Sequence, residues 1–461
     1  MTDLIADLKT LLGEGGVIEG DDAAAMAKSR WSRLGAPRAV LRPRSTAEVS
    51  AVLRLAHAAG APVIPWGGRT GLVDGAEASG GLALSLERLN RIEEVDVAGG
   101  VMTVEAGCIL QTVCEAAEAE GFQFPLDLGA RGSATIGGTI STNAGGNRVI
   151  RYGMMRELVL GLEAVLADGT VVTSMNRLIK NNAGYDLKQL FIGTEGTLGV
   201  VTRAVLRLRS APASQNTAFL AVDSFEALPR LLRQLERGFG GTLSAFEVLW
   251  SDYYELVTSA PATNRIVLPL GHPYYVLVEA MGGDPAGDDE RFLRVLTEAM
   301  EGGDVADAAI AKTQGERDAM WALRDDVGQT ARNRPVFSFD VSLRISAMDA
   351  YVRQVRETLT ARWPKTTLMV FGHLGDGNLH LIAGVGEGGP AVRHAVEEAV
   401  YLPLKAIDGS ISAEHGIGLQ KREFLPLSRS PAELALMRTL KTALDPKGIL
   451  NPGKVVEASA A

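Results

Sequence analysis

The sequence predicts a multidomain α+β protein, and three observations support this fold class. The chain has 461 residues, enough for two or three domains with sizeable hydrophobic cores. Glycine is abundant, with 52 residues, and much of it clusters between apolar runs before residue 200, as in a loop-rich ligand-binding domain. Residues 215–350 instead alternate helical patterns with apolar strand patterns, which predicts a second α+β domain.

The first half of the chain carries clear helix and strand signals. The opening segment, MTDLIADLKTLLGEGG, has apolar residues at helical spacing and predicts a surface helix. Ser45 and Glu48 form a capping signal for a helix that we expect to end at Gly60. PVIPWGG then predicts a short buried strand entering a turn, and LVLGLEAVLADGTVV (158–172) predicts two strands joined at Asp168-Gly169.

The second half continues with longer elements. FEALPRLLRQLERG and DERFLRVLTEAMEGG predict helices, and YYVLVEAMG (274–282) predicts a strand between them. The tail, SPAELALMRTLKTALDPKGILNPGKV, predicts a capped helix followed by a Pro- and Gly-rich segment. We therefore expect three regions: a ligand-binding domain over 1–212, a second domain over 213–410, and a C-terminal segment over 411–461.

Composition excludes several classes of protein. With 46 basic and 55 acidic residues, the net charge of −9 argues against nucleic acid as the main partner. Only Cys108 and Cys114 are present, too few for a disulfide framework, so we expect a reducing compartment and a cytoplasmic protein. We expect no signal peptide and no transmembrane segment, because the longest apolar run, LVLGLEAVLA, is short and contains Glu163. Peripheral attachment to a membrane remains open.

FGHLGDGNLH, residues 371–380, places two histidines around an Asp-Gly pair. Asp-Gly between apolar runs is the strongest short-range signal for a two-residue hairpin loop. With Asp376 and Gly377 as the loop, His373 would lie directly opposite His380, with Cβ atoms roughly 5 Å apart. Two such imidazoles could share one metal ion. Two packed or hydrogen-bonded histidines on a half-buried strand are the alternative, and this segment alone does not decide between them.

Two glycine-rich stretches in the first half point to a dinucleotide. PWGGRTGLVDGA (65–76) and GSATIGGTISTNAGGN (132–147) offer glycines that let backbone approach a ligand and free N–H groups that can hold pyrophosphate oxygens. Neither matches G-x-G-x-x-G at the start of a βαβ helix, and no P-loop motif occurs, so an ordinary Rossmann or P-loop site is unsupported. Glycine-rich turns without a ligand are the alternative.

Longer motifs resemble a known family. PVIPWGGRTGLVDGA, PLDLGARGSATIGGTISTNAGGNRVIRYGMMRELVLGLEAVLADGTVV and KNNAGYDLKQLFIGTEGTLGVVT resemble the FAD-binding half of the vanillyl-alcohol oxidase and p-cresol methylhydroxylase (PCMH) superfamily. FGHLGDGNLH, SAEHGIGLQKREFL and ALDPKGILNPGKV are similar to the branch containing FAD-linked D-lactate and D-2-hydroxyglutarate dehydrogenases. The resemblance spans nearly the whole chain. It implies a two-subdomain PCMH-type FAD-binding domain, an α+β substrate (cap) domain, and a C-terminal segment that returns to the flavin.

The resemblance also implies a cofactor site. We expect non-covalent FAD, because no His or Cys stands in the first glycine-rich loop where it could attach a flavin, and Cys108 is better explained as a small buried side chain. The residues that the resemblance assigns to FAD lie in the glycine-rich loops, in the GTEGTLGV segment and in the C-terminal LNPGK: Pro65, Gly67, Gly68, Arg69, Thr70, Gly71, Ser133, Thr135, Gly138, Ser141, Asn143, Ala144, Gly145, Gly196, Val200 and Asn451. For Asn451, a Pro-Gly turn that ends the fold is the alternative.

For the second half, the resemblance implies a catalytic metal centre. Similar proteins bind a divalent metal, usually zinc, through the residues corresponding to His373, His380 and Glu414, which leaves a coordination position open. His415 corresponds to the base, and imidazole can accept a proton at neutral pH. Arg324 corresponds to a substrate-binding arginine suited to a carboxylate, with a surface salt bridge as the alternative. Manganese or iron could use the same ligand atoms.

Three departures from the branch bear on the substrate. Ser338, Gly328 and Ile382 stand where the 2-hydroxyglutarate enzymes carry Lys, Thr and Asn, so each removes a polar partner for a second carboxylate. We therefore predict hydride transfer from D-lactate to flavin N5, with D-2-hydroxyglutarate or D-malate as the alternative. Arg344, where relatives tend to have Pro, could supply the lost charge or simply face water at a strand end.

The partners follow from the same chemistry. We expect a small 2-hydroxy acid as the substrate and a quinone, an electron-transfer flavoprotein or oxygen as the electron acceptor. The sequence leaves the oligomeric state open, and a homodimer is compatible with it. A metal- and flavin-binding subunit that only relays electrons for a partner is a more distant alternative.

Overall fold

The computed structural model describes residues 4–29, 32 and 34–457. The chain divides into two compact units, and each is built from separate stretches of sequence. Unit 1 comprises Met1–Gly146, Gly153–Ala211 and Glu414–Ala461, whereas unit 2 comprises Asn147–Tyr152 and Pro212–Ala413. The short insertion of 147–152 into unit 2 carries one helix, α6 (Val149–Tyr152), and no sequence signal indicated it. No described helix is both long enough and apolar enough to cross a membrane.

Unit 1 contains a four-stranded sheet, a five-stranded antiparallel sheet and a two-stranded ribbon. The first sheet has the order β1-β2-β4-β3, the second β5-β6-β10-β8-β9, and the ribbon pairs β11 with β7. The strands are β1 (Val17–Ile18), β2 (Ala39–Leu41), β3 (Val63–Trp66), β4 (Leu82–Ser85), β5 (Ile92–Asp96), β6 (Val101–Glu105), β7 (Phe122–Gln123), β8 (Val159–Val165), β9 (Val171–Ser174), β10 (Val200–Arg207) and β11 (Arg209–Ser210). The helices are α1 (Leu4–Leu12), α2 (Gly20–Met26), α3 (Thr46–Ala59), α4 (Leu110–Ala119), α5 (Ile136–Thr142), α7 (Met155–Leu158) and α14 (Pro431–Leu444), with 3-10 turns η1 (Leu187–Leu190) and η6 (Arg422–Leu427).

The local signals in this half are confirmed. The hydroxyl of Ser45 accepts the N–H of Glu48 at the start of α3, and Gly60 ends the helix in the left-handed region. β8 and β9 pair antiparallel on either side of Asp168-Gly169. One apolar core, which includes Leu8 of α1, Leu53 of α3 and Leu84 of β4, joins these elements.

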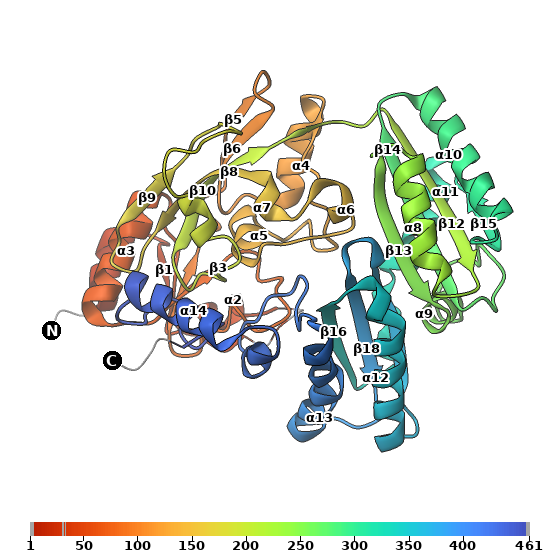
Figure 1. Ribbon diagram of the computed structural model, residues 1–461. Coiled ribbons are helices and arrows are strands. Elements are labelled where there is room, and N and C mark those ends of the chain that lie inside the picture. Colours follow the sequence, from red (N-terminus) through yellow and green to blue (C-terminus); the bar gives the residue numbers. More distant parts are fainter. Residues whose placement is uncertain (1–3, 30–31, 33, 458–461) are drawn as a thin grey trace. The chain divides into compact units, whose positions relative to one another are not determined.

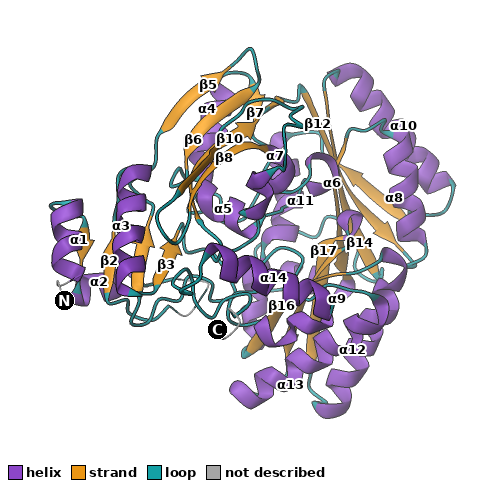
Figure 2. Cartoon of the chain, turned by 60° about the vertical axis from the view of Figure 1, so that its left-hand side comes forward, coloured by secondary structure: helices purple, strands orange, loops and turns teal. Residues whose placement is uncertain are grey.

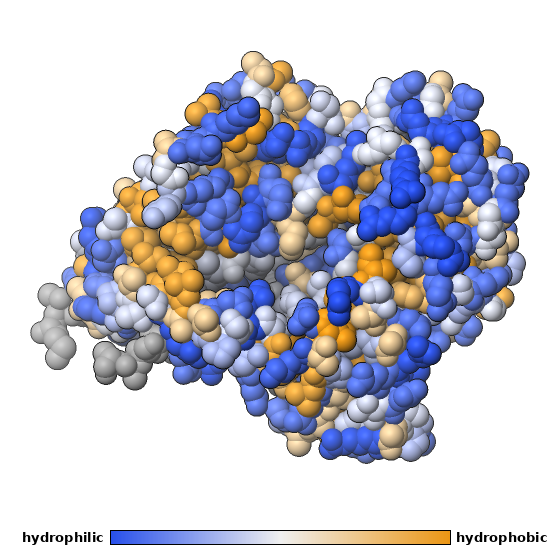
Figure 3. All heavy atoms as spheres, viewed as in Figure 1, coloured by the Kyte–Doolittle hydropathy of each residue, from blue (hydrophilic) through white to orange (hydrophobic). Residues whose placement is uncertain are grey.

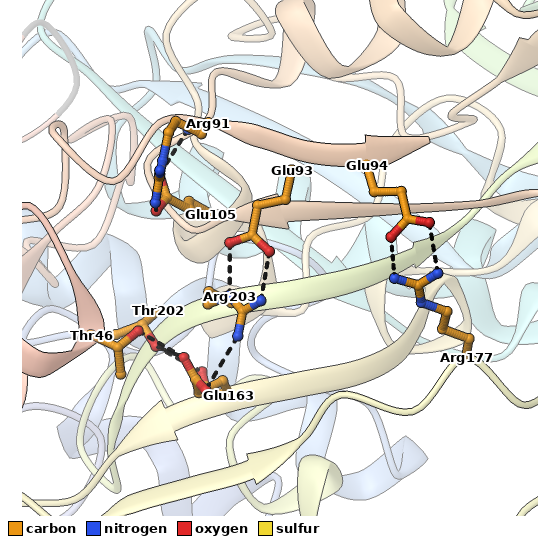
Figure 4. Close-up of polar contacts among 9 residues, drawn as sticks. All are labelled: Thr46, Arg91, Glu93, Glu94, Glu105, Glu163, Arg177, Thr202 and Arg203. Atoms are coloured by element: carbon orange, nitrogen blue, oxygen red, sulfur yellow. Dashed lines mark hydrogen bonds and ion pairs between the residues drawn. The ribbon is translucent and has the colours of Figure 1, made fainter. Parts of the chain in front are cut away.

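Cross-strand ion pairs hold the five-stranded sheet (Figure 4). Arg203 of β10 bonds Glu93 of β5 and also lies 3.5 Å from Glu163 of β8. Glu163 in turn accepts the hydroxyl of Thr46, the first residue of α3. Because Arg203 spans three strands, this network fixes the register of β10, whose N-terminal end follows the GTEGTLG segment.

The C-terminal segment of unit 1 returns to the N-terminal elements, as Figure 1 shows for the blue and orange parts of the chain. Asn451 and Val63 pair through the N–H of Asn451 and the carbonyl of Val63, and Val63 donates in turn to Ile449. Lys441 of α14 is buried, and its ammonium bonds the Asp445 carboxylate and the carbonyls of Thr197 and Leu450. This buried group therefore ties α14 to the GTEGTLG segment.

Unit 2 is built on a seven-stranded antiparallel sheet with the order β15-β12-β14-β13-β17-β18-β16. Its strands are β12 (Ser214–Val222), β13 (Leu243–Trp250), β14 (Tyr274–Gly282), β15 (Asp307–Ile310), β16 (Val336–Ser342), β17 (Thr367–His373) and β18 (Asn378–Gly384). Its remaining helices are α8 (Ala227–Gly238), α9 (Ser251–Thr258), α10 (Pro285–Glu301), α11 (Gln314–Asp325), α12 (Met348–Arg362) and α13 (Pro390–Tyr401), with 3-10 turns η2 (Val327–Asn333), η3 (Ile345–Ala347), η4 (Leu374–Asp376) and η5 (Leu402–Ile407). The predicted strand over 274–282 is confirmed, as are the helices on both sides of it.

Helices cover both faces of this sheet (Figure 2). One face packs against α9 and α11 through an aromatic cluster that includes Tyr253, Phe371 and Tyr275. The opposite face carries α8 and α10, and Phe239, which directly follows α8, stacks on Phe292 of α10. Helix α8 turns an arginine-rich hydrophilic face to solvent, visible as a blue patch in Figure 3. The face toward α9 and α11 carries the residues described next.

Candidate functional site

The two histidines of the hairpin lie together, but in a different register from the predicted one. Phe371, not His373, pairs with His380, and the turn consists of Leu374–Asp376 and Gly377. The expectation of a two-residue loop that sets His373 directly opposite His380 was therefore wrong. The 3-10 turn lengthens the loop by two residues, and since strand side chains alternate with period two, both imidazoles still face the same side. Their ring centroids lie 5.4 Å apart.

Gly372 permits the close approach of the two strands at this turn. A Cβ atom there would lie 2.5 Å from the backbone oxygen of Asn378 and 3.0 Å from Cα of Leu379. Real Cβ atoms essentially never come so close, so only glycine fits without moving β18. The glycine therefore helps to fix the separation of the two strands that carry the imidazoles.

A buried carboxylate links His373 to Arg324. Glu247 of β13 is fully buried, and its Oε1 lies 2.6 Å from Nδ1 of His373. Its Oε2 accepts Nε of Arg324 at 2.9 Å, and a terminal nitrogen of Arg324 lies 2.9 Å from Nε2 of His373. Arg324 lies in the last turn of α11, whose N-terminus is held by a capping box between Thr313 and Glu316. The surface salt bridge that we considered for Arg324 is thus a buried ion pair.

The electrostatics of this triad favour the ionised pair. Burial by itself would raise the pKa of Glu247, but its interactions with His373 and Arg324 outweigh burial and lower it below the ordinary value. Burial would likewise lower the pKa of Arg324, but Glu247 and Asp325 outweigh it and raise that pKa. Glu247 is therefore a carboxylate that can only accept, and the proton between it and His373 belongs to Nδ1.

Glu414 completes a set of metal-type ligands. Among the described residues, His373, His380 and Glu414 each offer one ligand atom, and these atoms lie within 4.8 Å of one another. Glu414 follows Ala413, the last residue of unit 2, whose N–H donates to the buried Asp340 at 3.0 Å. Asp340 in turn pairs with His380 across β16 and β18. Asp340 therefore holds the chain immediately before Glu414, and His415 is the next residue.

The donor set fits a divalent metal. Because Glu247 takes the Nδ1 proton of His373, the lone pair of Nε2 is directed away from Glu247, as a ligand nitrogen requires. Asn378 lies on the same strand face as His380, two residues earlier. Its side chain is buried, and neither amide atom has a hydrogen-bond partner among the described residues. A buried amide without hydrogen-bond partners, two residues from His380, is consistent with a site that binds a polar ligand, which would supply those partners.

The residues that depart from the 2-hydroxyglutarate enzymes occupy different surroundings. Ser338 and Ile382 are direct cross-strand partners, and they form the next pair after Asp340 and His380 on the face of the sheet that carries the histidines. Ile382 is buried in the aromatic cluster, whereas Ser338 is exposed. Gly328 lies exposed in η2, and Arg344 is exposed just after β16. The N–H of Leu343, the residue immediately before Arg344, donates to the carbonyl of Gly377. This bond attaches the chain at Arg344 to the hairpin turn.

In unit 1 the two glycine-rich stretches pack against each other. A Cβ atom on Gly67 would lie 2.6 Å from Oγ1 of Thr135, and one on Gly68 would lie 2.0 Å from the carbonyl oxygen of Ser133. Thr135 caps α5 by accepting the N–H of Gly138. Side chains are thus excluded where the two loops meet. Gly71, by contrast, has open space where a Cβ would point.

Several buried polar atoms of unit 1 support a cofactor cradle. Arg69 has a left-handed backbone, stacks over the Trp66 ring at 5.1 Å, and leaves its Nε without a described partner. Oδ1 of Asn451 and Oγ of Ser85 are likewise buried and unpaired among the described residues. Such atoms in one glycine-lined region fit a polar ligand with many acceptors and donors, as a dinucleotide has. Ser85 carried no sequence signal.

The other residues expected at the cofactor take structural roles in the chain. Ser141 bonds the carbonyl of Gly137 and accepts the N–H of Glu195 through its own carbonyl. The side chain of Asn143 accepts the N–H of Arg156. Val200 is buried in the apolar core at the start of β10. The remaining expected positions lie in the same loops, with Pro65 in β3 against Gly196, Thr70 in the first loop, and Ala144 and Gly145 just after α5.

Glu195 is a residue that sequence reasoning missed. It has a positive φ of 54°, and its buried carboxylate accepts the N–H groups of Ile417 at 2.7 Å and Gly418 at 2.9 Å. Burial raises its pKa above the ordinary value. Glu195 therefore anchors the loop that follows His415 to the GTEGTLG segment, and its carbonyl also accepts the amide of Asn451.

Cys108 is buried, as expected for a small core side chain, and Cys114 is buried as well. Burial raises the pKa of Cys108 to about 12 and that of Cys114 to about 11. A thiol with so high a pKa is not a ready nucleophile at neutral pH.

Comparison with known proteins extends these findings. Residues 37–174 match the family described as "FAD binding domain", and residues 211–455 match "FAD linked oxidases, C-terminal domain". A mitochondrial protein of Arabidopsis thaliana named D-2-hydroxyglutarate dehydrogenase is 38% identical over 99% of this chain and 82% of its own length. A mitochondrial protein of Schizosaccharomyces pombe, provisionally named a D-lactate dehydrogenase, is 36% identical over 92% of this chain and 82% of its own. The solved structure of p-cresol methylhydroxylase with bound substrate covers 99% of this chain and 97% of its own, with a TM-score of 0.78 and 15% identity, and so shares the fold.

Proposed function

Because the chain belongs to the family of FAD-linked oxidases, we propose that it is an FAD-dependent dehydrogenase that oxidises a D-2-hydroxy acid to the 2-oxo acid. The observation that carries this proposal is the convergence of ligand atoms from His373, His380 and Glu414 within 4.8 Å, with His415 next in the chain. Relatives named for D-2-hydroxy acids over nearly the full length support the same substrate class.

The site residues suit this chemistry. His415 accepts the hydroxyl proton of the substrate as a general base. Arg324 binds the substrate carboxylate. Its contacts with Glu247 and Asp325 use two of its five N–H groups, and the N–H that contacts Nε2 of His373 would be released when that nitrogen binds the metal. A divalent metal held by His373, His380 and Glu414, with zinc as our first choice, would polarise the substrate oxygens. Bound FAD would supply the hydride acceptor, its N5 atom.

Within this class we propose D-lactate as the preferred substrate. Ser338 and Ile382 form a cross-strand pair on the histidine face, so the strand positions next to His380 offer one hydroxyl and one apolar side chain. A second carboxylate placed there would lose its hydration without gaining charged partners, which is costly. A compact monocarboxylate avoids this cost.

D-2-hydroxyglutarate, with D-malate, is the second candidate, and the name of the relative in Arabidopsis thaliana favours it. Arg344 is exposed beside the hairpin turn and has no described ion pair, so it could serve a second carboxylate from a direction that the relatives do not use. We further propose a cytoplasmic protein whose electrons pass to a quinone or an electron-transfer flavoprotein.

Replacement of His415 separates a dehydrogenase from a subunit that only relays electrons. We expect His415→Asn to slow anaerobic flavin reduction by D-2-hydroxy acids by at least 100-fold, as loss of a general base does, while dithionite still reduces the flavin. His394→Asn, which changes a half-buried histidine of α13, is the matched control and should reduce its flavin at the wild-type rate. Wild-type reduction rates in His415→Asn would refute the assigned role of this base.

A further inference from the structure

The buried carboxylate of Glu247 contacts two groups that the proposed function assigns to different tasks. Its Oε1 lies 2.6 Å from Nδ1 of His373, and its Oε2 accepts Nε of Arg324 at 2.9 Å. Each oxygen thus serves one partner, and the same carboxylate fixes a metal-type imidazole and a substrate-type guanidinium. None of the sequence motifs described above contains this residue.

The geometry determines which nitrogen of His373 carries the proton. An ionised carboxylate is acceptor-only, so Nδ1 must donate to Glu247. Nε2 must then be an acceptor, and the 2.9 Å contact with the guanidinium of Arg324, which can only donate, agrees with this tautomer. Two independent neighbours, one on each side of the ring, therefore specify the same protonation of His373.

The second contact of Glu247 explains how this carboxylate can remain ionised in the core. Glu247 is fully buried on β13, and an unpaired buried carboxylate would bind a proton instead. Arg324, held at the end of α11, supplies the compensating charge. With the charge balanced, Glu247 can orient His373 permanently.

We propose that Glu247 is a positioning residue which fixes the Nδ1–H tautomer and the ring orientation of His373. Nε2 is then the nitrogen that binds the metal, in place of the Arg324 N–H that it accepts in this structure. This inference rests on the metal site of the proposed function. In metalloproteins, a carboxylate often accepts the N–H of the histidine ring nitrogen that does not bind the metal. This bond makes the metal-binding nitrogen more basic, and its loss weakens metal binding by roughly 10- to 100-fold.

Glu279 provides a matched control. It is also a fully buried glutamate, on the adjacent strand β14, and it also accepts an arginine Nε, that of Arg148 at 3.0 Å. Trp321 of α11 donates to Glu279, just as Arg324 of the same helix donates to Glu247. No contact joins Glu279 to His373 or His380 among the described residues. Glu279→Gln therefore reproduces the loss of a buried charge without touching the proposed metal site.

The first test is the affinity of metal-stripped, FAD-loaded protein for Zn²⁺ alone, measured by competition with a chromophoric chelator. We expect Glu247→Gln to bind Zn²⁺ about 10- to 100-fold more weakly than the wild type, and Glu279→Gln to bind it as tightly as the wild type. Equal affinity in Glu247→Gln and the wild type would overturn the inference but leave the proposed function standing. Equal weakening in both variants would also overturn it, because the effect would then be one of general destabilisation. A wild-type protein that does not bind Zn²⁺ would overturn both the inference and the proposed metal site.

The second test needs no variant of Glu247 and therefore stands even if Glu247→Gln does not fold. Long-range ¹⁵N–¹H correlation spectra of the metal-stripped wild type report the protonation of each histidine ring, and His373→Gln identifies the signals of His373. We expect a protonated Nδ1 and an unprotonated Nε2. A protonated Nε2 with an unprotonated Nδ1 would overturn the inference, and zinc binding need not be measured to reach that conclusion.

Discussion

At the scale of single residues, Asn378 illustrates how a functional requirement can cost stability. Its amide is buried on the face of β18 that carries His380, and neither the oxygen nor the nitrogen has a described partner. An unsatisfied buried polar group costs roughly 1–3 kcal/mol, which natural cores rarely tolerate without a reason. A polar substrate at this site would supply the missing partner.

This reasoning predicts opposite effects of Asn378→Leu on stability and on activity. Leucine has a similar shape and leaves no polar atom unsatisfied. We therefore expect the free energy of unfolding to stay the same or to rise by up to about 1 kcal/mol, with a thermal midpoint that is unchanged or higher. We expect kcat/KM for the D-2-hydroxy acid to fall at least 10-fold. Thermal unfolding and steady-state kinetics on the same samples check both effects. A variant with a lowered midpoint and unchanged kcat/KM would show that the amide serves the fold and not the substrate.

Sequence reasoning could predict the ligand-type residues but not the residues that hold them. His373, His380 and Glu414 are found by their motifs, and the structure brings them together. Glu247 and Glu195 stand in unremarkable strand and loop sequence, 126 and 222 residues from the groups they bond. Only tertiary pairing reveals them, since a lone glutamate in an apolar strand carries no signal of its partner.

At the scale of elements, the hairpin of β17 and β18 decides whether the two histidines meet. The sequence correctly predicts two strands and a turn at this place, but the turn is a 3-10 turn ending at Gly377 and not a two-residue loop. The register is set by contacts on both sides, because β13 pairs with β17 and β16 pairs with β18. The sequence of the turn alone carries no information about these neighbouring strands, so it could not predict the register.

The close strand approach at Gly372 predicts a strong effect of a single methyl group. We expect Gly372→Ala to push β18 away from β17 and to weaken Zn²⁺ binding at least 10-fold, because the added Cβ would lie 2.5 Å from the backbone oxygen of Asn378. Gly315→Ala, in the first turn of α11 where a Cβ meets no atom within 4 Å, is the control. We expect it to leave Zn²⁺ affinity unchanged and to stabilise the protein by at most about 1 kcal/mol. Wild-type Zn²⁺ affinity in Gly372→Ala would mean that the strand spacing does not set the ligand geometry.

At the scale of the whole molecule, each unit is assembled from distant parts of the chain. The capped helices and the apolar strands follow from local patterns, so much of the secondary structure could be predicted. The closing of unit 1 by α14 and Asn451 was implied only by family resemblance, because Lys441 and Asp445 read locally as an ordinary surface pair four residues apart. In the structure that pair is buried and holds Thr197, more than 200 residues earlier in the chain.

The same scale holds the central claim, that a flavin unit and a metal-type hydroxy-acid site act in one enzyme. The most direct measurement is anaerobic bleaching of the visible flavin band in purified, Zn²⁺-loaded protein, titrated in parallel with D-lactate, L-lactate and D-2-hydroxyglutarate. The account predicts bleaching by both D-acids and none by L-lactate, with D-lactate effective at the lower concentration. It also predicts that removing Zn²⁺ with a chelator abolishes bleaching by every acid while dithionite still reduces the flavin. An oxidised flavin band that persists with both D-acids in the metal-loaded protein would contradict the proposed dehydrogenase.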